Sequence, residues 1–205
     1  MLIGVSLGPG DPDLMTIRAK KALKTSDEVF VPGERAKNIV KKYCDPKELD
    51  FPMTEDEEVL KEYWVKNAKK VGPLAKEKKV SLAGIGDLCF FSTFGHVKKE
   101  VEKIFPEVRT RTIPGVSSIT ASAAKLDLNV QSSFEVTDGS EKNKKIVLKA
   151  TKPKSLAEKL KNEGYSEFTL GENLFREDEK ITKDLPEESS YFSLLVAEKE
   201  EQSWK

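Results

Sequence analysis

The sequence has few of the residues that build metal sites and disulfide frameworks. It contains one histidine, His96, and two cysteines, Cys44 and Cys89, which lie far apart without a C-x-x-C pair. This scarcity excludes a disulfide framework and a Cys/His zinc site, because His96 has no second histidine to bind a metal with it. We therefore predict no metal site and, for Cys89, a small buried side chain without a nucleophilic role.

Long apolar runs and an excess of charge of one sign are absent as well. No stretch approaches the roughly 18 apolar residues of a membrane span, and no signal peptide is recognisable. The 35 Lys and Arg residues balance 35 Asp and Glu residues, so no net field attracts nucleic acid or an anionic membrane. The sequence predicts a soluble cytoplasmic protein without a nucleic-acid or membrane partner. Its 205 residues suit one large domain or two smaller ones.

An unusual loop lies near the start of the chain. Gly8, Pro9, Gly10 and Pro12 fall within five residues, so glycine freedom and proline rigidity together fix the backbone. The loop lacks both the lysine of a P-loop and the spacing G-x-G-x-x-G, which argues against phosphate or dinucleotide binding. It offers main-chain carbonyls and the carboxylate of Asp11 instead. The plainer alternative is an ordinary strand-to-helix turn.

The first half of the chain alternates strands and helices. Residues 2–7 and 79–84 are apolar runs typical of buried strands, and Thr16 precedes a helix with alanine and leucine on its inner face. Capping-box spacing between Thr54 and Glu57 predicts the start of a long amphipathic helix. The other elements expected here are strands at 28–32 and 108–112 and helices at 93–104 and 116–126. This rhythm predicts a parallel-rich sheet with helices on its faces.

The second half has a different pattern. After a polar loop we expect a strand at 146–150, a helix opened by Ser155, and strands at 167–171, 180–182 and 191–197. We place a domain boundary near Pro114, which gives one α/β domain at residues 1–114 and another at residues 115–205. The predicted fold class is α/β, with two α/β domains and a ligand cleft between them.

Three loops fall at the carboxyl ends of expected strands, where ligands of α/β sheets bind. Together they resemble the motifs of the tetrapyrrole methylases, which transfer a methyl group from S-adenosylmethionine to a carbon of a corrin or porphyrin precursor. The family's Gly-x-Gly-Pro-Gly-Asp-Pro loop is matched by residues 6–12, with Ser6 in place of the first glycine. Its Gly-Asp-Pro motif is matched at Gly86 and Asp87, with Leu88 in place of proline. Its third motif, Pro-Gly-Val followed by Thr or Ser and then Ser or Ala, is matched at 114–118. The resemblance covers nearly the whole chain.

Finer features are similar to one branch of the family, the methyltransferases that act on C20 of precorrin-2 or cobalt-factor II in cobalamin biosynthesis. They lie in residues 51–54, 92–94, 113–118 and 191–195. The resemblance therefore implies a C20-methyltransferase that uses S-adenosylmethionine and forms a homodimer. Any cobalt would belong to the tetrapyrrole substrate.

The resemblance also implies site residues, with the methyl donor folded between the domains and held largely by main-chain groups. Asp87 would accept from the donor's amino group or stabilise its sulfonium, and Asp11 is the candidate base for the proton lost on methylation. Basic residues should pair with the substrate's carboxylates, and Arg18, Arg35 and Lys37 are candidates. The positions that match for donor binding are Pro9, Gly86, Asp87, Leu88, Phe90, Ser117, Ser118, Lys149 and Ala150.

Alternatives stay open at this point. Asp87 has a structural interpretation as a helix N-cap or turn residue, and Ser117 and Ser118 as hydroxyls that satisfy free helix N–H groups. The same fold could methylate another ring carbon, the diphthine intermediate of an elongation factor, or ribosomal RNA, although neutral charge disfavours RNA. A non-catalytic relative that only binds ligand is the remaining alternative.

Overall fold

The computed structural model describes residues 1–200 and contains two compact units, of which the first is residues 1–134 and the second begins at Glu135. Residues 115–134 thus belong with the first unit by their contacts. The domain boundary that we place near Pro114, with domains at residues 1–114 and 115–205, stays a prediction. In the described residues, no helix is both long enough and apolar enough to cross a membrane.

The first unit is built on a five-stranded parallel sheet with the order β3-β2-β4-β1-β5. The central strands are fully buried, as expected for a parallel sheet covered on both faces. The predicted α/β class is confirmed. The strands are β1 (Leu2–Ser6), β2 (Glu28–Val31), β3 (Lys47–Glu48), β4 (Val80–Gly84) and β5 (Thr110–Ile113).

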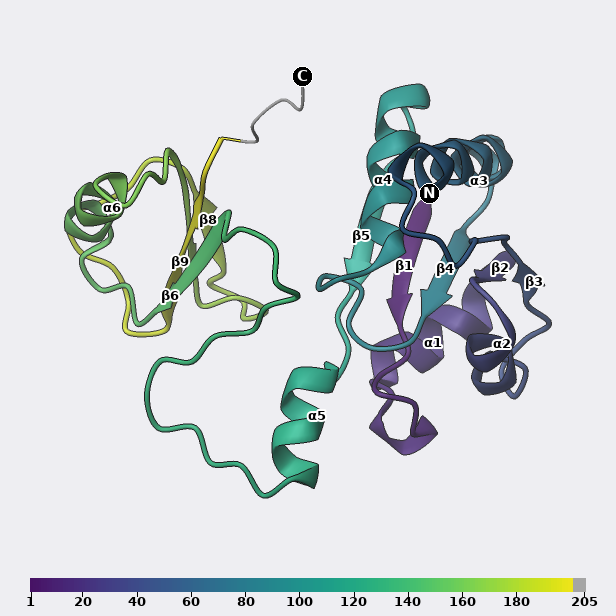
Figure 1. The fold of residues 1–205 in the computed structure, drawn as a ribbon, viewed down its shortest axis with the longest axis horizontal. Helices are drawn as coiled ribbons and strands as arrows, with labels where there is room; N and C mark the ends of the chain where they lie inside the picture. The colour runs from purple at the N-terminus through teal and green to yellow at the C-terminus, as the bar shows by residue number, and fades with distance from the viewer. Residues whose placement is uncertain (201–205) are drawn as a thin grey trace. The chain divides into compact units, whose positions relative to one another are not determined.

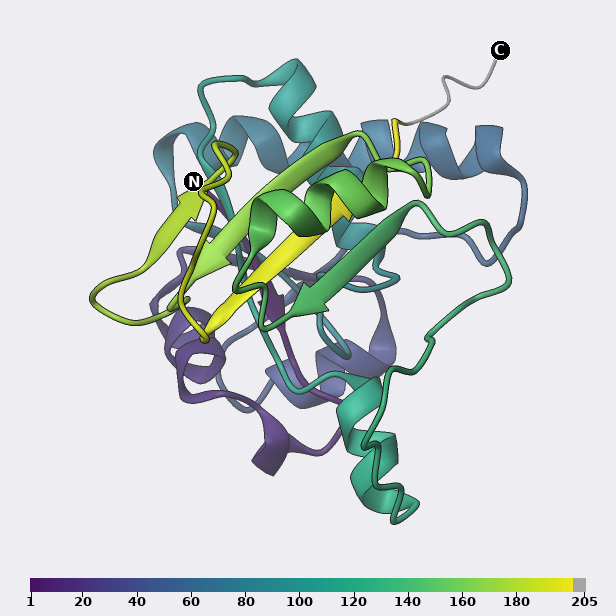
Figure 2. The same ribbon diagram turned by 90° about the vertical axis from the view of Figure 1, so that its left-hand side faces the viewer.

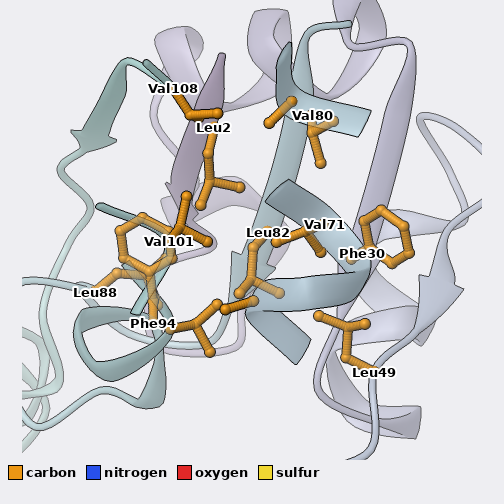
Figure 3. Packing of buried hydrophobic residues seen from close by; sticks show 13 residues of the cluster. Leu2, Phe30, Leu49, Val71, Val80, Leu82, Leu88, Phe94, Val101 and Val108 are labelled. Atoms are coloured by element: carbon orange, nitrogen blue, oxygen red, sulfur yellow. The ribbon is translucent and has the colours of Figure 1, made fainter. Parts of the chain in front are cut away.

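Helices cover both faces of this sheet. Successive side chains of a strand point to opposite faces, so neighbouring residues of β1 pack against different helices. Leu2 joins a core cluster with residues of α3 (Glu57–Glu77) and α4 (Thr93–Ile104), including Val71 and Val101, as Figure 3 shows. Ile3 joins a second cluster, with residues of α1 (Ile17–Thr25) and α2 (Glu34–Val40). Figure 1 shows these four helices around the sheet.

Helix starts were predicted with mixed success. Thr16 caps α1 as expected, since its hydroxyl accepts the N–H of Ala19 at 3.2 Å. The cap of α3 is Asp56, whose carboxylate accepts two backbone N–H groups, so the prediction for Thr54 was wrong. The prediction that Ser155 opens the next helix was also wrong. Helix α6 (Pro153–Lys161) begins two residues earlier, at a proline whose missing N–H suits the first helical position.

The second unit contains a four-stranded antiparallel sheet with the order β6-β9-β7-β8. Figure 2 shows α6 lying across one face of it. The core between helix and sheet includes Leu160, Leu170 and Leu195. The strands are β6 (Lys144–Leu148), β7 (Glu167–Glu172), β8 (Lys180–Thr182) and β9 (Ser193–Glu198).

Candidate functional site

The three motif loops of the first unit meet at the carboxyl edge of the parallel sheet. The first loop follows β1, the second follows β4 and the third follows β5, and β1 lies between the other two strands. Gly8 and Gly86 form an antiparallel bridge in which the N–H of Gly8 donates to the Gly86 carbonyl at 3.2 Å and the N–H of Gly86 donates back at 2.7 Å. The backbone itself therefore joins the first two loops.

Asp87 joins the second loop to the third. Its Oδ1 accepts the N–H of Cys89 at 2.9 Å, and its Oδ2 accepts the N–H of Gly115 at 3.2 Å. Helix α4 is capped by Ser92, so Asp87 is not the cap of that helix. An ionised carboxylate has about four acceptor sites, which leaves Asp87 capacity for a further donor such as an ammonium group.

Ser6, the last residue of β1, lies against both neighbouring loops. Its buried Oγ accepts the N–H of Leu88 at 3.0 Å. A Cβ placed on Gly115 would lie 2.6 Å from the Cβ of Ser6, so only glycine fits at position 115 without a shift. In the sequence, Ser6 and Leu88 are two separate departures from the family motifs, and their contact was not predicted.

Open space lies beside the second loop. Gly86 has φ of +84°, and a Cβ placed there would meet no described atom within 4 Å beyond its chain neighbours. A cavity of about 180 Å³ lies next to this loop, and Leu88, Phe91 and Pro32 are among its lining residues. Ligand sites commonly measure about 300–1,000 Å³, so this cavity suits a part of a ligand and not the whole of a larger one.

Two exposed aromatic side chains, Phe90 and Phe91, follow the second loop, and Phe91 lines the cavity. Phe90 is 46% exposed and Phe91 is 68% exposed. Phe91 also has φ of +48°, a left-handed conformation that a bulky residue rarely adopts and that clusters at functional sites. These two rings are available to a ligand at this loop.

The other predicted residues of the first unit have local roles. Asp11 is exposed, and its Oδ1 accepts the N–H of Asp13 at 2.9 Å, which caps the short 3-10 helix η1 (Pro12–Leu14). Ser117 caps α5 (Ser118–Lys125), with its Oγ accepting the N–H of Ile119 at 3.0 Å. Ser118 is exposed at the start of that helix, and Pro9 is half-buried in the first loop.

Two predicted residues lie in the second unit, and their part in the site stays a prediction. Lys149 is exposed with φ of +56°, and its Nζ lies 5.1 Å from the ring centre of Tyr191, whose side-chain hydrogen bond raises the pKa of the lysine. Ala150 is fully buried, and its carbonyl accepts the hydroxyl of Ser189 at 2.6 Å.

The burial of Cys89 differs from the prediction. Cys89 is exposed, so the prediction of a buried side chain was wrong. Partial burial and the nearby Asp87 raise the pKa of its thiol to about 11, which disfavours the nucleophilic thiolate.

Among the basic residues predicted to bind the substrate, Lys37 forms an ion pair with Glu48 at 2.7 Å. No group of three or more candidate metal ligands is present within residues 1–200.

Comparison with known proteins gives this site a family context. A sequence model of the tetrapyrrole (corrin/porphyrin) methylases matches residues 1–187. A Methanocaldococcus jannaschii protein named "Probable cobalt-precorrin-2 C(20)-methyltransferase" is 40% identical in an alignment of 134 residues that covers 61% of this chain and 56% of that protein. The aligned part thus spans about half the length of that relative.

Two further similarities cover more of the chain. A second Methanocaldococcus jannaschii protein, named "Probable cobalt-precorrin-7 C(5)-methyltransferase", is 30% identical over 98% of this chain and 100% of its own length. The crystal structure of the methyltransferase CobJ covers 97% of this chain and 94% of its own, with a TM-score of 0.50 and 14% identity. At that identity the structural likeness supports the fold alone.

Proposed function

Because the chain belongs to the tetrapyrrole (corrin/porphyrin) methylases, we propose that it transfers the methyl group of S-adenosylmethionine to C20 of precorrin-2 or cobalt-factor II in cobalamin biosynthesis. The observation that carries the proposal is the convergence of the three motif loops, held together by the Gly8–Gly86 bridge and by Asp87. The 40% identity to a relative named for C20 methylation supports the choice of ring carbon.

The second loop suits one end of the methyl donor. The open space beside Gly86 lets a ligand approach the main chain, and Asp87 can accept from the donor's amino group while keeping its two backbone hydrogen bonds. Partly buried carboxylate and carbonyl groups also favour a cationic sulfonium. Further donor contacts are proposed for Pro9, Leu88, Phe90, Ser117, Ser118, Lys149 and Ala150.

The proposed reaction requires the methyl donor and the acceptor carbon to be aligned, and it requires no nucleophile from the protein. The donor supplies an electrophilic methyl group: a C20–CH3 bond forms while the S–CH3 bond breaks, and its electron pair stays on sulfur. Holding the two reactants in line supplies much of the acceleration. The proton lost from C20 then needs a base, for which we propose Asp11, whose exposed carboxylate lies at the end of the first loop.

The acceptor carries several carboxylates, and we propose that the exposed Arg18 and Arg35 bind some of them. Lys37 is less available because Glu48 pairs with it. We further propose a cytoplasmic homodimer. A monomer mass by light scattering at assay concentration would exclude the dimer.

Methylation of C5 is the second candidate. It is favoured by the 30% identity to a relative named for cobalt-precorrin-7, which extends over nearly the whole chain. The two candidates differ in the acceptor, so acceptor choice separates them.

The test is a comparison of acceptors. The purified protein is incubated with S-adenosylmethionine and, separately, with precorrin-2, cobalt-factor II or cobalt-precorrin-7, and the mass of each tetrapyrrole is followed. We expect one added methyl group on precorrin-2 or cobalt-factor II, and the faster of these two identifies the metal state of the substrate. Turnover of cobalt-precorrin-7 alone would support C5 methylation, and donor binding without turnover of any acceptor would support a non-catalytic relative.

A further inference from the structure

Ser6 and Leu88 are 82 positions apart, yet they meet in a buried hydrogen bond. Ser6 is fully buried at the end of β1, and the side chain of Leu88 is 6% exposed in the core beneath the second loop. We propose that Ser6 is a positioning residue for donor binding and that Ser6 and Leu88 work as one unit that sets the shape of the second loop. This inference rests on the proposed use of S-adenosylmethionine.

The hydrogen bond explains why these two departures from the family motifs occur together. A proline at position 88 has no N–H, so the hydroxyl of Ser6 would have no donor there. Steric conflict is the larger effect. The Ser6 Oγ lies 3.0 Å from the nitrogen of residue 88, and a proline ring carbon bonded to that nitrogen at about 1.5 Å would lie within roughly 2 Å of Oγ. Serine at 6 and proline at 88 therefore exclude each other.

The converse also holds. With leucine at position 88, a glycine at position 6 would leave the buried N–H of Leu88 without an acceptor, which is unfavourable. A serine at 6 satisfies this N–H, and a glycine at 6 makes room for a proline at 88. The structure thus allows two matched combinations, serine with leucine and glycine with proline.

Ser6 reaches the predicted donor contacts through the backbone. Leu88 directly follows Gly86 and Asp87, and Asp87 in turn holds the N–H of Gly115, which lies against Ser6. Fixing the nitrogen of Leu88 therefore fixes where the second loop presents Gly86 and the Asp87 carboxylate. A loop released from Ser6 would occupy the binding conformation for a smaller fraction of the time, and apparent affinity falls by that fraction.

The experiment measures S-adenosylmethionine binding by calorimetry for the whole chain and for Ser6→Ala, Ser6→Gly, Leu88→Pro and the double variant S6G/L88P. We expect Ser6→Ala to weaken binding about tenfold, in line with one lost buried hydrogen bond. Leu88→Pro should weaken it by about 100-fold or more, or fail to fold, because of the clash. The double variant should fold and bind at least tenfold more tightly than Leu88→Pro, because removal of the Ser6 side chain relieves the clash.

Two controls separate positioning from general stability. Ser81→Ala removes another fully buried hydroxyl in the same sheet, one that bonds to Ser26 at 2.7 Å. It should lower the unfolding temperature without changing donor affinity. Leu88→Ala keeps the N–H while it removes the side chain, so it reports the packing contribution alone. Hydrogen exchange of the Leu88 amide should be slow in the wild type and faster in Ser6→Ala.

The outcomes are distinct. A double variant that binds no better than Leu88→Pro, or a Ser6→Ala protein that binds like the wild type, overturns the pairing. A wild-type protein that binds no S-adenosylmethionine overturns the proposed function, and with it the positioning role. In that case, slow Leu88 amide exchange that depends on Ser6 would still establish the hydrogen bond as a structural one.

Discussion

Gly115→Ala tests the packing of the three loops at its tightest point. The added Cβ would lie 2.6 Å from the Cβ of Ser6 and 3.1 Å from the carbonyl oxygen of Gly86. Carbon atoms in favourable contact lie about 3.5–4.0 Å apart, so the third loop must move by roughly 1 Å. Neither contact can yield easily, because Ser6 is fully buried on the central sheet and Gly86 is held by its bridge to Gly8.

The movement has a cost in stability and in binding. The bond from the Gly115 N–H to Asp87 is already 3.2 Å long, and a further 1 Å would break it. Overpacking costs about 1–3 kcal/mol, and a lost hydrogen bond to a charged group costs about 1.5–3 kcal/mol. Since the two effects share atoms, we expect a total loss of about 2–4 kcal/mol in unfolding free energy and at least a tenfold loss of donor affinity.

Urea unfolding and calorimetric titration with S-adenosylmethionine measure the two effects. Gly95→Ala is the matched control, because Gly95 lies in α4 and a Cβ there would meet no described atom within 4 Å. That control should stabilise the protein by about 0.5–1 kcal/mol, since alanine is the better helix former. If Gly115→Ala unfolds at the wild-type urea concentration and binds the donor equally well, the loop arrangement described here is wrong.

Three further predictions concern charged and titratable groups. Asp87→Ala should leave the fold intact and weaken donor binding in calorimetry, because the donor's amino group loses its proposed acceptor and two backbone N–H groups of the loops lose theirs; unchanged affinity would refute the role of Asp87. Glu28 has a lowered pKa because Lys47 and Lys78 donate hydrogen bonds to it. Its stabilising effect is present above the ordinary carboxyl pKa of 4.5 and is lost as pH falls through the folded value, so Glu28→Gln should lower the melting temperature at pH 7 and not at pH 3. Because the pKa of Cys89 is raised to about 11, its alkylation at pH 8, followed by peptide mass spectrometry, should be about 100-fold slower than that of an unperturbed thiol; an equal rate would contradict the described environment.

Much of the first unit could be predicted from the sequence because its strands are continuous buried runs between loops rich in glycine and proline. The strand at 80–84 and the helix at 93–104 were placed within a residue of their observed ends. Short elements were missed, since α2 and β3 are too brief to show a periodic pattern. The cap of α3 was misplaced because Thr54 and Asp56 both have side chains that can accept helix N–H groups, and only the structure shows which does.

The candidate site was harder to predict than the fold. Motif likeness indicated which loops matter, but contacts between loops join residues far apart in the chain. The bond between Ser6 and Leu88 and the bond between Asp87 and Gly115 are of this kind. A single sequence contains no local signal for such pairs. Two coincident departures from a known motif, at positions 6 and 88, were the available hint.

The ring carbon that receives the methyl group decides whether the protein is a C20-methyltransferase. The protein is incubated with S-adenosylmethionine carrying a ¹³C-labelled methyl group and with cobalt-factor II or precorrin-2, and the product is examined by NMR for the carbon that bears the label. We expect one labelled methyl group on C20. A label on any other ring carbon, or a bound donor that never transfers its methyl group to either tetrapyrrole, would contradict it.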